Sequence, residues 1–332
     1  MRRVSYASVL ERAAVLFNGD PDPTAEDAAL LNVFLNRRLE ECWQQYWWPE
    51  WTPVEKRYFA PFWDVAETYH AGDFVYYSPG DEYYQCLPLV TVGTVPGTSE
   101  AWAEAQLELS ADDWVATTAY VAGDQIFYAT TGYWYQCLVA STGDLPTDTT
   151  HWCRLYQFYR EVEYEATGET KIAECRRVWD ADPEADAHAD TITFQLRSTG
   201  IIVWTSDASC WVEFRLEVPS YSGAAWAAAT TYAADDQVYV SSEGDYYKAL
   251  QASTNKNPVT ETTYWERIEF PRILRDAVAQ GAYADMLRAD GQNDKFVAEE
   301  QEFRRQVARA IGLIQRQQGQ TPQLNVVSRN PV

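Results

Sequence analysis

The sequence Asp-Phe-Val-Tyr-Tyr at residues 73–77, followed by Tyr-Tyr-Gln-Cys-Leu at residues 83–87, decides the fold of a large part of the chain. Alternating side chains on both sides of a Gly- and Asp-containing break are typical of a short β-hairpin. The preceding pair Gly72-Asp73 supplies a turn, in which the carboxylate can accept local backbone N–H bonds. We therefore expect a small β module at this point.

The same pattern occurs three times, and the copies align without gaps over about 24 positions. Repeat 1 opens at Trp63, repeat 2 at Trp114 and repeat 3 at Trp226, and each passes through a proline-containing stretch before a closing tryptophan. A module this small buries little surface, so we expect its aromatic side chains to form the core. The predicted core residues are Trp63, Tyr69 and Trp102 in repeat 1, Trp114, Tyr120 and Trp152 in repeat 2, and Trp226, Tyr232 and Trp265 in repeat 3.

Charge is unevenly distributed along the 332 residues, which carry 49 Asp and Glu against 26 Lys and Arg. Residues 58–153 contain thirteen acids and no Lys or Arg, whereas no acid follows Glu302. The net charge of −23 disfavours general binding to a phosphate backbone. No window contains the roughly 18–20 consecutive apolar residues of a membrane-spanning helix, so we expect a soluble protein with no membrane partner.

Helical periodicity marks both ends of the chain. Residues 5–17 and 30–46 carry apolar stripes, and Thr24 with Asp27 resembles a capping box before the second helix. Near the other end, Pro271 opens a helix that Asp290-Gly291 interrupts, and a longer helix is expected over 294–318. Neither end can bury its stripe alone, so we expect one helical domain from residues 1–56 and 270–318.

The region at residues 156–222 is different and rich in predicted strands, for example at 192–196, 201–204 and 210–216. The expected fold is α+β: a helical bundle built from both chain ends, a central antiparallel β domain at 156–222, and three inserted β modules. The modules occupy residues 57–113 with a connection, 114–155 and 223–269, and residues 319–332 form an extended tail.

No pattern typical of a catalytic or metal site stands out. The three histidines lack metal-ligand spacing, and no phosphate-cradling or nucleophile motif is present. The acid cluster at 180–190 lacks the order of a calcium loop, and the six cysteines contain no C-x-x-C pair. We therefore expect no enzyme activity, no cofactor, no metal and structural thiols.

The repeat pattern, W…Y-x-x-G-D-x-V…Y-x-C/A-L…P…W, resembles the chitin-binding module of many bacterial chitinases. The resemblance implies candidate glycan contacts at Tyr84, Tyr135 and Tyr247. The family usually has a further tryptophan just after this strand, where the chain has residues 88–90, 139–141 and 251–253 instead. A carbohydrate-binding adhesin or decoration protein, directed at cell-surface or chitin-like glycans, is one function that follows.

A second resemblance lies in residues 25–51 and 279–295, which are similar to the helical blocks of tailed-bacteriophage head-to-tail adaptor proteins. It implies a neck protein of the virion, assembled in the host cytoplasm as a homo-oligomeric ring of about twelve copies. The implied partners are the portal protein, a downstream tail tube or nozzle protein, and genomic DNA that passes without sequence-specific contact. An acidic protein suits a channel that repels phosphate, although the acidic modules can face either the channel or the outside.

The basic C-terminal stretch is the expected portal-docking segment of such a ring. Its charge opposes that of the rest of the chain, and an extended end can bind a partner by strand pairing or by inserting into a groove. The predicted docking residues are Arg304, Arg305, Arg309, Arg316, Leu324, Val326, Val327 and Arg329.

Overall fold

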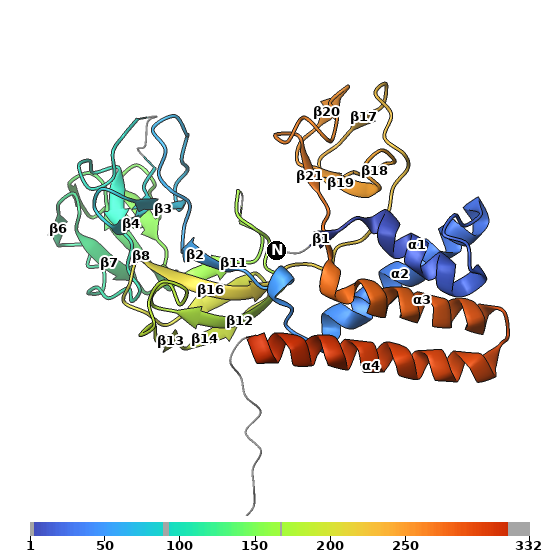
Figure 1. The fold of residues 1–332 in the computed structure, drawn as a ribbon. Coiled ribbons are helices and arrows are strands. Elements are labelled where there is room, and N and C mark those ends of the chain that lie inside the picture. The colour runs from blue at the N-terminus through green and yellow to red at the C-terminus, as the bar shows by residue number, and fades with distance from the viewer. Residues whose placement is uncertain (1–2, 89–92, 167, 318–332) are drawn as a thin grey trace, which may run out of the picture. The chain divides into compact units, whose positions relative to one another are not determined.

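The computed structural model describes residues 3–88, 93–166 and 168–317 of the chain (Figure 1). They fall into two compact units, one from Met1–Trp51 with Glu217–Val332 and one from Thr52–Leu216. Helices and antiparallel sheets are both present, which confirms the α+β class. In the part of the chain that is described, no helix combines the length and apolar character needed to cross a membrane.

Helices dominate the first unit. Its α-helices in the described residues are α1 (Tyr6–Asn18), α2 (Ala25–Gln45), α3 (Arg275–Ala289) and α4 (Asn293–Gln317), with short 3₁₀ turns η1 (Pro49–Trp51) and η2 (Arg272–Leu274). The hydroxyl of Thr24 accepts from the backbone N–H of Asp27 at 3.2 Å and donates to its carboxylate at 2.8 Å. This confirms the cap and explains why α2 begins five residues earlier than its apolar stripe suggested.

Helix α3 is the centre of this unit, because α1, α2 and α4 all pack against it. Its residues are small, so neighbouring helices approach closely on several sides. The buried residues of α3 are Ala277, Val278, Ala279, Gln280, Gly281, Ala282, Ala284, Asp285, Met286 and Leu287. Gly291, at φ +75°, forms the turn after which α4 runs back alongside α3 (Figure 1).

Strands of the first unit belong mainly to repeat 3. A three-stranded antiparallel sheet has the order β18 (Gln237–Val240), β19 (Asp245–Ala249), β21 (Trp265–Arg267), and β17 (Thr231–Tyr232) pairs with β20 (Ser253–Thr254). The terminal strand β1 (Arg3–Val4) pairs with β22 (Phe270–Pro271). Repeat 3 is therefore part of the helical unit rather than a separate insert.

Repeats 1 and 2 lie in the second unit and have the same three-stranded plan. Repeat 1 has the order β3 (Phe74–Tyr77), β4 (Glu82–Cys86), β5 (Trp102–Glu104). Repeat 2 has β7 (Gln125–Tyr128), β8 (Tyr133–Cys137) and β10 (Trp152–Leu155), with β6 (Ala119–Tyr120) paired to β9 (Ser141–Thr142). The predicted hairpins are confirmed, and the closing tryptophan of each repeat begins the third strand.

The predicted turn chemistry also holds in all three repeats. The carboxylates of Asp73, Asp124 and Asp236 accept the backbone N–H three residues earlier at 2.7, 2.8 and 2.7 Å. The hairpin tips at Asp81, Gly132 and Gly244 all have left-handed φ angles of 55°, 74° and 69°. Glycine adopts this conformation without steric cost, and aspartate tolerates it.

The remaining strands of the second unit form two antiparallel sheets. One has the order β13 (Thr191–Ile192), β12 (Glu174–Trp179), β16 (Ser209–Arg215), β2 (Val54–Tyr58). The other has β11 (Glu161–Glu163), β15 (Gly200–Val203) and β14 (Phe194–Leu196). Because β2 pairs with β16, residues 52–56 belong to this unit, which corrects the expectation that they join the helices.

The other boundary also differs from the expected one at residue 222. Tyr221 is buried in the first unit, where its ring stacks on Tyr6 with centroids 4.9 Å apart and contacts Phe270. Its backbone N–H donates to the Asn36 side chain of α2 at 2.7 Å. These contacts bring residues 217–222 to the helices.

Candidate functional sites

The closing tryptophans are the centre of each repeat. Trp102, Trp152 and Trp265 are buried, and their indole N–H groups donate to backbone carbonyls at 2.9, 3.2 and 3.0 Å. An edge-on tyrosine lies 5.2–5.3 Å from each indole ring. The pairs are Tyr69 with Trp102, Tyr120 with Trp152, and Tyr232 with Trp265.

The opening tryptophans Trp63, Trp114 and Trp226 are only half-buried and pack at the margin of these cores. The first two meet a tyrosine edge-on, at 5.7 Å for Trp63 with Tyr77 and 5.5 Å for Trp114 with Tyr128. The core predicted for each repeat therefore has a fully buried end and a partly exposed end.

The predicted glycan contacts require correction. Tyr135 is 8% exposed and Tyr247 is 6% exposed, so neither ring offers a free face on which a sugar could stack. Both belong to the cores of their repeats, because they point to the same side of the hairpin as the closing tryptophan. Tyr84 is half-buried against the core of repeat 1, and its hydroxyl contacts Glu82 at 3.2 Å.

A second recurring aromatic pair lies on the opposite face of each hairpin and was not singled out from the sequence. The pairs are Tyr76 with Tyr83, Phe127 with Trp134, and Tyr239 with Tyr246, each with ring centroids 5.1 Å apart. Their constant offset from the opening tryptophan was the available signal.

This aromatic face attaches the repeats to their surroundings. Tyr83 stacks on Phe158 at 4.8 Å within the core of the central β sheets. In repeat 3, Tyr246 meets Tyr6 of α1 edge-on at 5.0 Å. Trp134 packs against a cluster that contains Leu87 and Leu138, which joins repeats 1 and 2. The outer aromatic face thus serves internal packing.

Repeat 3 is also joined to α1 by polar contacts. The carboxylate of Asp245, 1% exposed, accepts the backbone N–H of Tyr6 at 2.7 Å and pairs with Arg267. Burial raises the pKa of Asp245, although the bond from Tyr6 and the charge of Arg267 act in the opposite direction. Because Tyr6 is the first residue of α1, the repeat caps this helix at its N-terminus.

Four of the five arginines predicted to dock a portal, Arg304, Arg305, Arg309 and Arg316, lie on α4, but they differ in their surroundings. Arg304 pairs with Glu300 at 3.1 Å, Arg305 pairs with Glu302, and Arg316 donates to the carbonyl of Gly312 at 3.0 Å. Glu300 and Glu302 precede Arg304 and Arg305 by one helical turn, so acids do pair with the first two arginines of the basic stretch although none follows Glu302 in the sequence. Arg309 has no ion-pair partner among the described residues.

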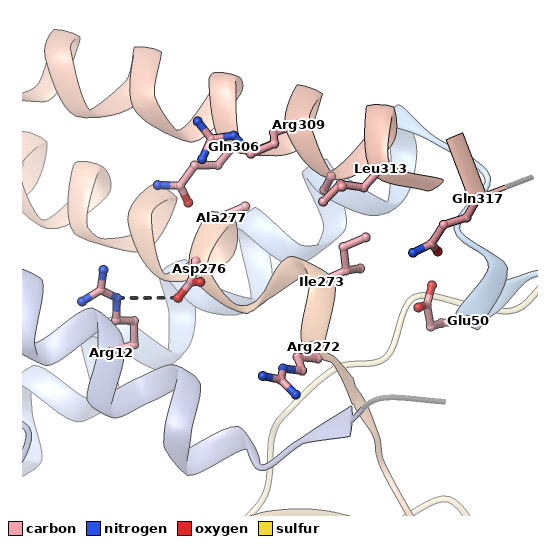
Figure 2. Close-up of a pocket in the computed structure, with 11 residues that line it drawn as sticks. Arg12, Glu50, Arg272, Ile273, Asp276, Ala277, Gln306, Arg309, Leu313 and Gln317 are labelled. Atoms are coloured by element: carbon pink, nitrogen blue, oxygen red, sulfur yellow. Dashed lines mark ion pairs between the residues drawn. The ribbon is translucent and has the colours of Figure 1, made fainter. Parts of the chain in front are cut away.

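Arg309 instead lines a groove of about 820 Å³ in the helical unit (Figure 2). Arg12 of α1 and Arg272 of η2 lie on the same groove, and Arg12 pairs with Asp276 at 3.7 Å. Within the described residues Arg272 has no carboxylate at salt-bridge distance. The rest of the lining is Glu50, Ile273, Asp276, Ala277, Gln306, Ala310, Leu313 and Gln317. Free guanidinium groups beside apolar residues suit an acidic segment with apolar side chains.

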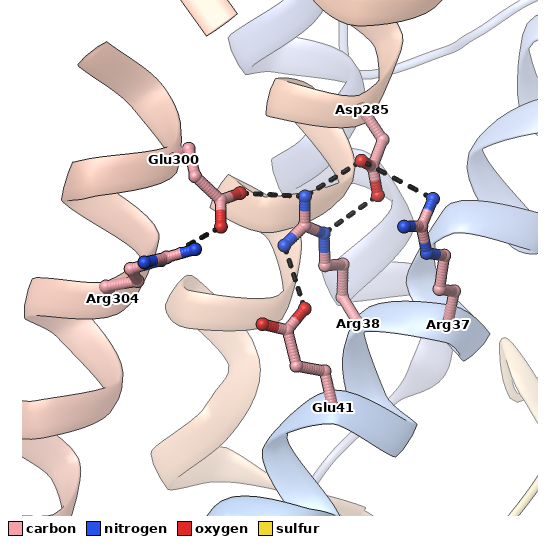
Figure 3. Close-up of polar contacts among 6 residues, drawn as sticks. All are labelled: Arg37, Arg38, Glu41, Asp285, Glu300 and Arg304. Atoms are coloured by element: carbon pink, nitrogen blue, oxygen red, sulfur yellow. Dashed lines mark hydrogen bonds and ion pairs between the residues drawn. The ribbon is translucent and has the colours of Figure 1, made fainter. Parts of the chain in front are cut away.

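A buried ionic network holds the helices that build this groove (Figure 3). Arg38 of α2, 4% exposed, donates to both carboxylate oxygens of Asp285 on α3 at 2.8 Å and contacts Glu300 of α4 at 2.8 Å. Burial alone lowers the pKa of Arg38, but Asp285 and Glu300 outweigh it, so the pKa is raised.

The backbone of α3 makes room for this arginine. A Cβ atom at Gly281 would lie 2.9 Å from the Arg38 side chain, so glycine allows the guanidinium stem to cross α3. The network thus depends on one small residue as well as on its charges.

The other predicted docking residues, Leu324, Val326, Val327 and Arg329, lie outside the described residues. No protein-family model matches the chain, and no curated protein matches it.

Proposed function

We propose that this chain is a structural virion protein, the head-to-tail adaptor of a tailed bacteriophage, which forms a ring between the portal and the tail. The observation that carries the proposal is the groove at η2 and α4, where Arg272 and Arg309 have no ion-pair partner among the described residues of an otherwise acidic protein. Such a groove gives the helical unit a surface for an acidic segment of a neighbouring protein. In the ring, one face of a subunit contacts a different face of the next, and DNA passes through the centre.

The location of the groove supports this role. Arg309, one of the predicted docking residues, lines the groove, as does Gln317 at the end of α4. The alternative of a glycan-binding adhesin has weaker support, because two of its three tyrosines are buried.

Two measurements test the proposal. Class averages of the purified protein in an electron microscope, alone and with DNA-filled heads that lack the adaptor, should show closed rings and rings attached to the portal. Arg309→Glu and deletion of residues 319–332 should each reduce attachment without breaking the ring. Arg305→Glu is the matched control, because Arg305 has its own partner in Glu302. A monomeric protein that never associates with heads would contradict the proposal.

A further inference from the structure

A cluster of potential metal ligands lies at the closing turn of repeat 2, away from the groove and the ionic network. Asp144, Asp148 and His151 each offer one ligand atom, and these three atoms lie within 4.8 Å of one another. The Nδ1 atom of His151 is 3.0 Å from Asp148 Oδ2, and its Nε2 atom is 3.9 Å from Asp144 Oδ2. We propose that these three residues bind a divalent transition-metal ion, with Zn²⁺ as the expected ion and water as the remaining ligand.

Only one nitrogen of His151 can bind the ion, and with one ligand atom from each residue the three atoms lie within 4.8 Å of one another, so coordination would draw them closer together. Ligand atoms of a tetrahedral zinc site lie roughly 3.3 Å apart, given Zn–N and Zn–O distances of about 2.0–2.2 Å. The three side chains are partly exposed, so an ion can reach them from solvent. An imidazole nitrogen with two carboxylates favours Zn²⁺ over Ca²⁺ or Mg²⁺, which prefer ligand sets made of oxygen.

Hydrogen bonds already orient both carboxylates. The Ser141 hydroxyl contacts Asp144 Oδ2 at 3.0 Å, while the N–H and hydroxyl of Thr150 donate to Asp148 Oδ1 at 2.9 and 2.7 Å. Supporting contacts of this kind commonly fix the ligands of metal sites.

Repeats 1 and 3 show that the turn does not need these side chains. Two backbone hydrogen bonds define the turn in each repeat. The carbonyl that accepts the indole N–H of the closing tryptophan belongs to Thr94 in repeat 1, Asp144 in repeat 2 and Lys256 in repeat 3. The carbonyl that accepts the backbone N–H of the leucine after the second strand belongs to Ala101, His151 and Tyr264, respectively. The same backbone turn therefore forms with three different sets of side chains. Repeat 3 has a carboxylate, Glu261, at the position of Asp148, but only repeat 2 has metal-ligating residues at the positions of Asp144 and His151 as well.

Repeat 3 also shows that these positions bring side chains together. The ammonium group of Lys256 lies 4.7 Å from the ring centroid of Tyr264, at the positions of Asp144 and His151. In repeat 2, a carboxylate and an imidazole occupy the same two places, with the carboxylate of Asp148 beside them, inside residues 58–153 with no Lys or Arg. A cation supplied from solution is the natural counterion for this arrangement.

The experiment uses the full-length chain without a histidine tag. Titration calorimetry with Zn²⁺, and absorption of bound Co²⁺ as a second readout, should show about one ion per chain. His151→Ala and His151→Tyr place the residues of repeats 1 and 3 at this position, so both variants should fold. Each should weaken Zn²⁺ binding more than about tenfold and abolish the Co²⁺ spectrum.

His70→Ala is the matched control, because His70 lies 3.7 Å from Asp73 in repeat 1 but has no second carboxylate within that distance among the described residues. It should bind Zn²⁺ as the unmodified protein does. Asp144→Asn tests the site without changing a histidine and should also weaken binding. No saturable binding by the unmodified protein, or equal binding by the His151 variants, would overturn the inference. The site does not depend on the proposed adaptor function.

Discussion

Arg38 is the buried cation that pairs with the carboxylates of Asp285 and Glu300 inside the helical unit. Replacing it with leucine leaves Asp285 buried at 2% exposure without its main partner, and breaking such a pair costs about 3–5 kcal/mol. We expect Arg38→Leu to lower the free energy of unfolding of the first unit by that amount in urea. The double variant Arg38→Leu, Asp285→Leu should recover much of the loss, since the most deeply buried carboxylate is removed together with its partner and Glu300 keeps its pair with Arg304.

Arg37 provides the control for this measurement. It lies 3.9 Å from the same carboxylate, but its side chain is 60% exposed, so Arg37→Leu should change stability by less than about 1 kcal/mol. Equal losses for both single variants would show that burial of Arg38 is not the cause.

The reactivity of the six cysteine thiols tests whether the folded protein protects them. Burial raises the pKa of the thiols of Cys42, Cys86, Cys175 and Cys210 to about 12 and that of Cys153 to about 11, and it also raises the pKa of Cys137. Because the thiolate is the reactive form, the folded protein should react slowly with a disulfide reagent at pH 8, and all six thiols should react in urea.

The sign of the pH dependence follows from these raised values. Folded thiols stay protonated while those of the unfolded chain ionise near pH 9, so stability is retained below pH 9 and falls as the pH rises further. Five of the thiols are buried and that of Cys175 is half-buried, so a thiol that reacts rapidly at pH 8 in the folded protein would contradict their assignment as structural groups.

At the scale of elements, the two ends of each aromatic core should contribute unequally. Trp265 is 2% exposed, and Trp265→Ala should lower the stability of repeat 3 by about 3–5 kcal/mol. Trp226 is half-buried at the margin of the same core, so Trp226→Ala should cost distinctly less. Hydrogen exchange of the β18–β19 amides measures both. Equal losses would mean that the opening tryptophan is as important to the core as the closing one.

The elements that could be predicted from the sequence are those held by interactions between residues close together in the chain. The hairpins and their Gly-Asp turns follow from residues within a few positions of each other, as Asp73, Asp124 and Asp236 show. The capping of α2 by Thr24 is local for the same reason. Two of the three predicted glycan contacts are buried, because alternation fixes which strand residues share a face but not which face is covered. Tyr135 and Tyr247 lie on the inner face.

At the scale of the whole molecule, each unit has its own core, and the second is continuous in sequence. We expect residues 52–216, expressed alone, to unfold in one cooperative transition and to keep the near-ultraviolet circular dichroism of packed tyrosine and tryptophan rings. Residues 57–216, which lack part of β2, should be less stable because β2 is the edge strand beside β16. An unfolded 52–216 fragment would show that this unit depends on the helices.

The division into these units could not be predicted from the repeats. All three share one pattern, yet repeats 1 and 2 belong to the second unit and repeat 3 to the first. The difference arises from contacts between residues far apart in the chain, such as Asp245 with Tyr6 and Tyr221 with Asn36. Sequence periodicity does not report such pairings. The metal ligands of repeat 2 were missed similarly, because their positions converge only once the turn has formed.

The bond from Tyr6 to Asp245 joins residues 239 positions apart, and this has a consequence for how the protein is made. A ribosome adding about 5–20 residues per second needs roughly 12–50 s to reach Asp245 after it has passed Tyr6. During that interval α1 lacks its contact with Asp245 and both α1 and α2 lack α3, while residues 52–216 can already fold. The first helices to leave the ribosome are therefore among the last to be buried, and their apolar stripes need protection from aggregation until the end of the chain arrives.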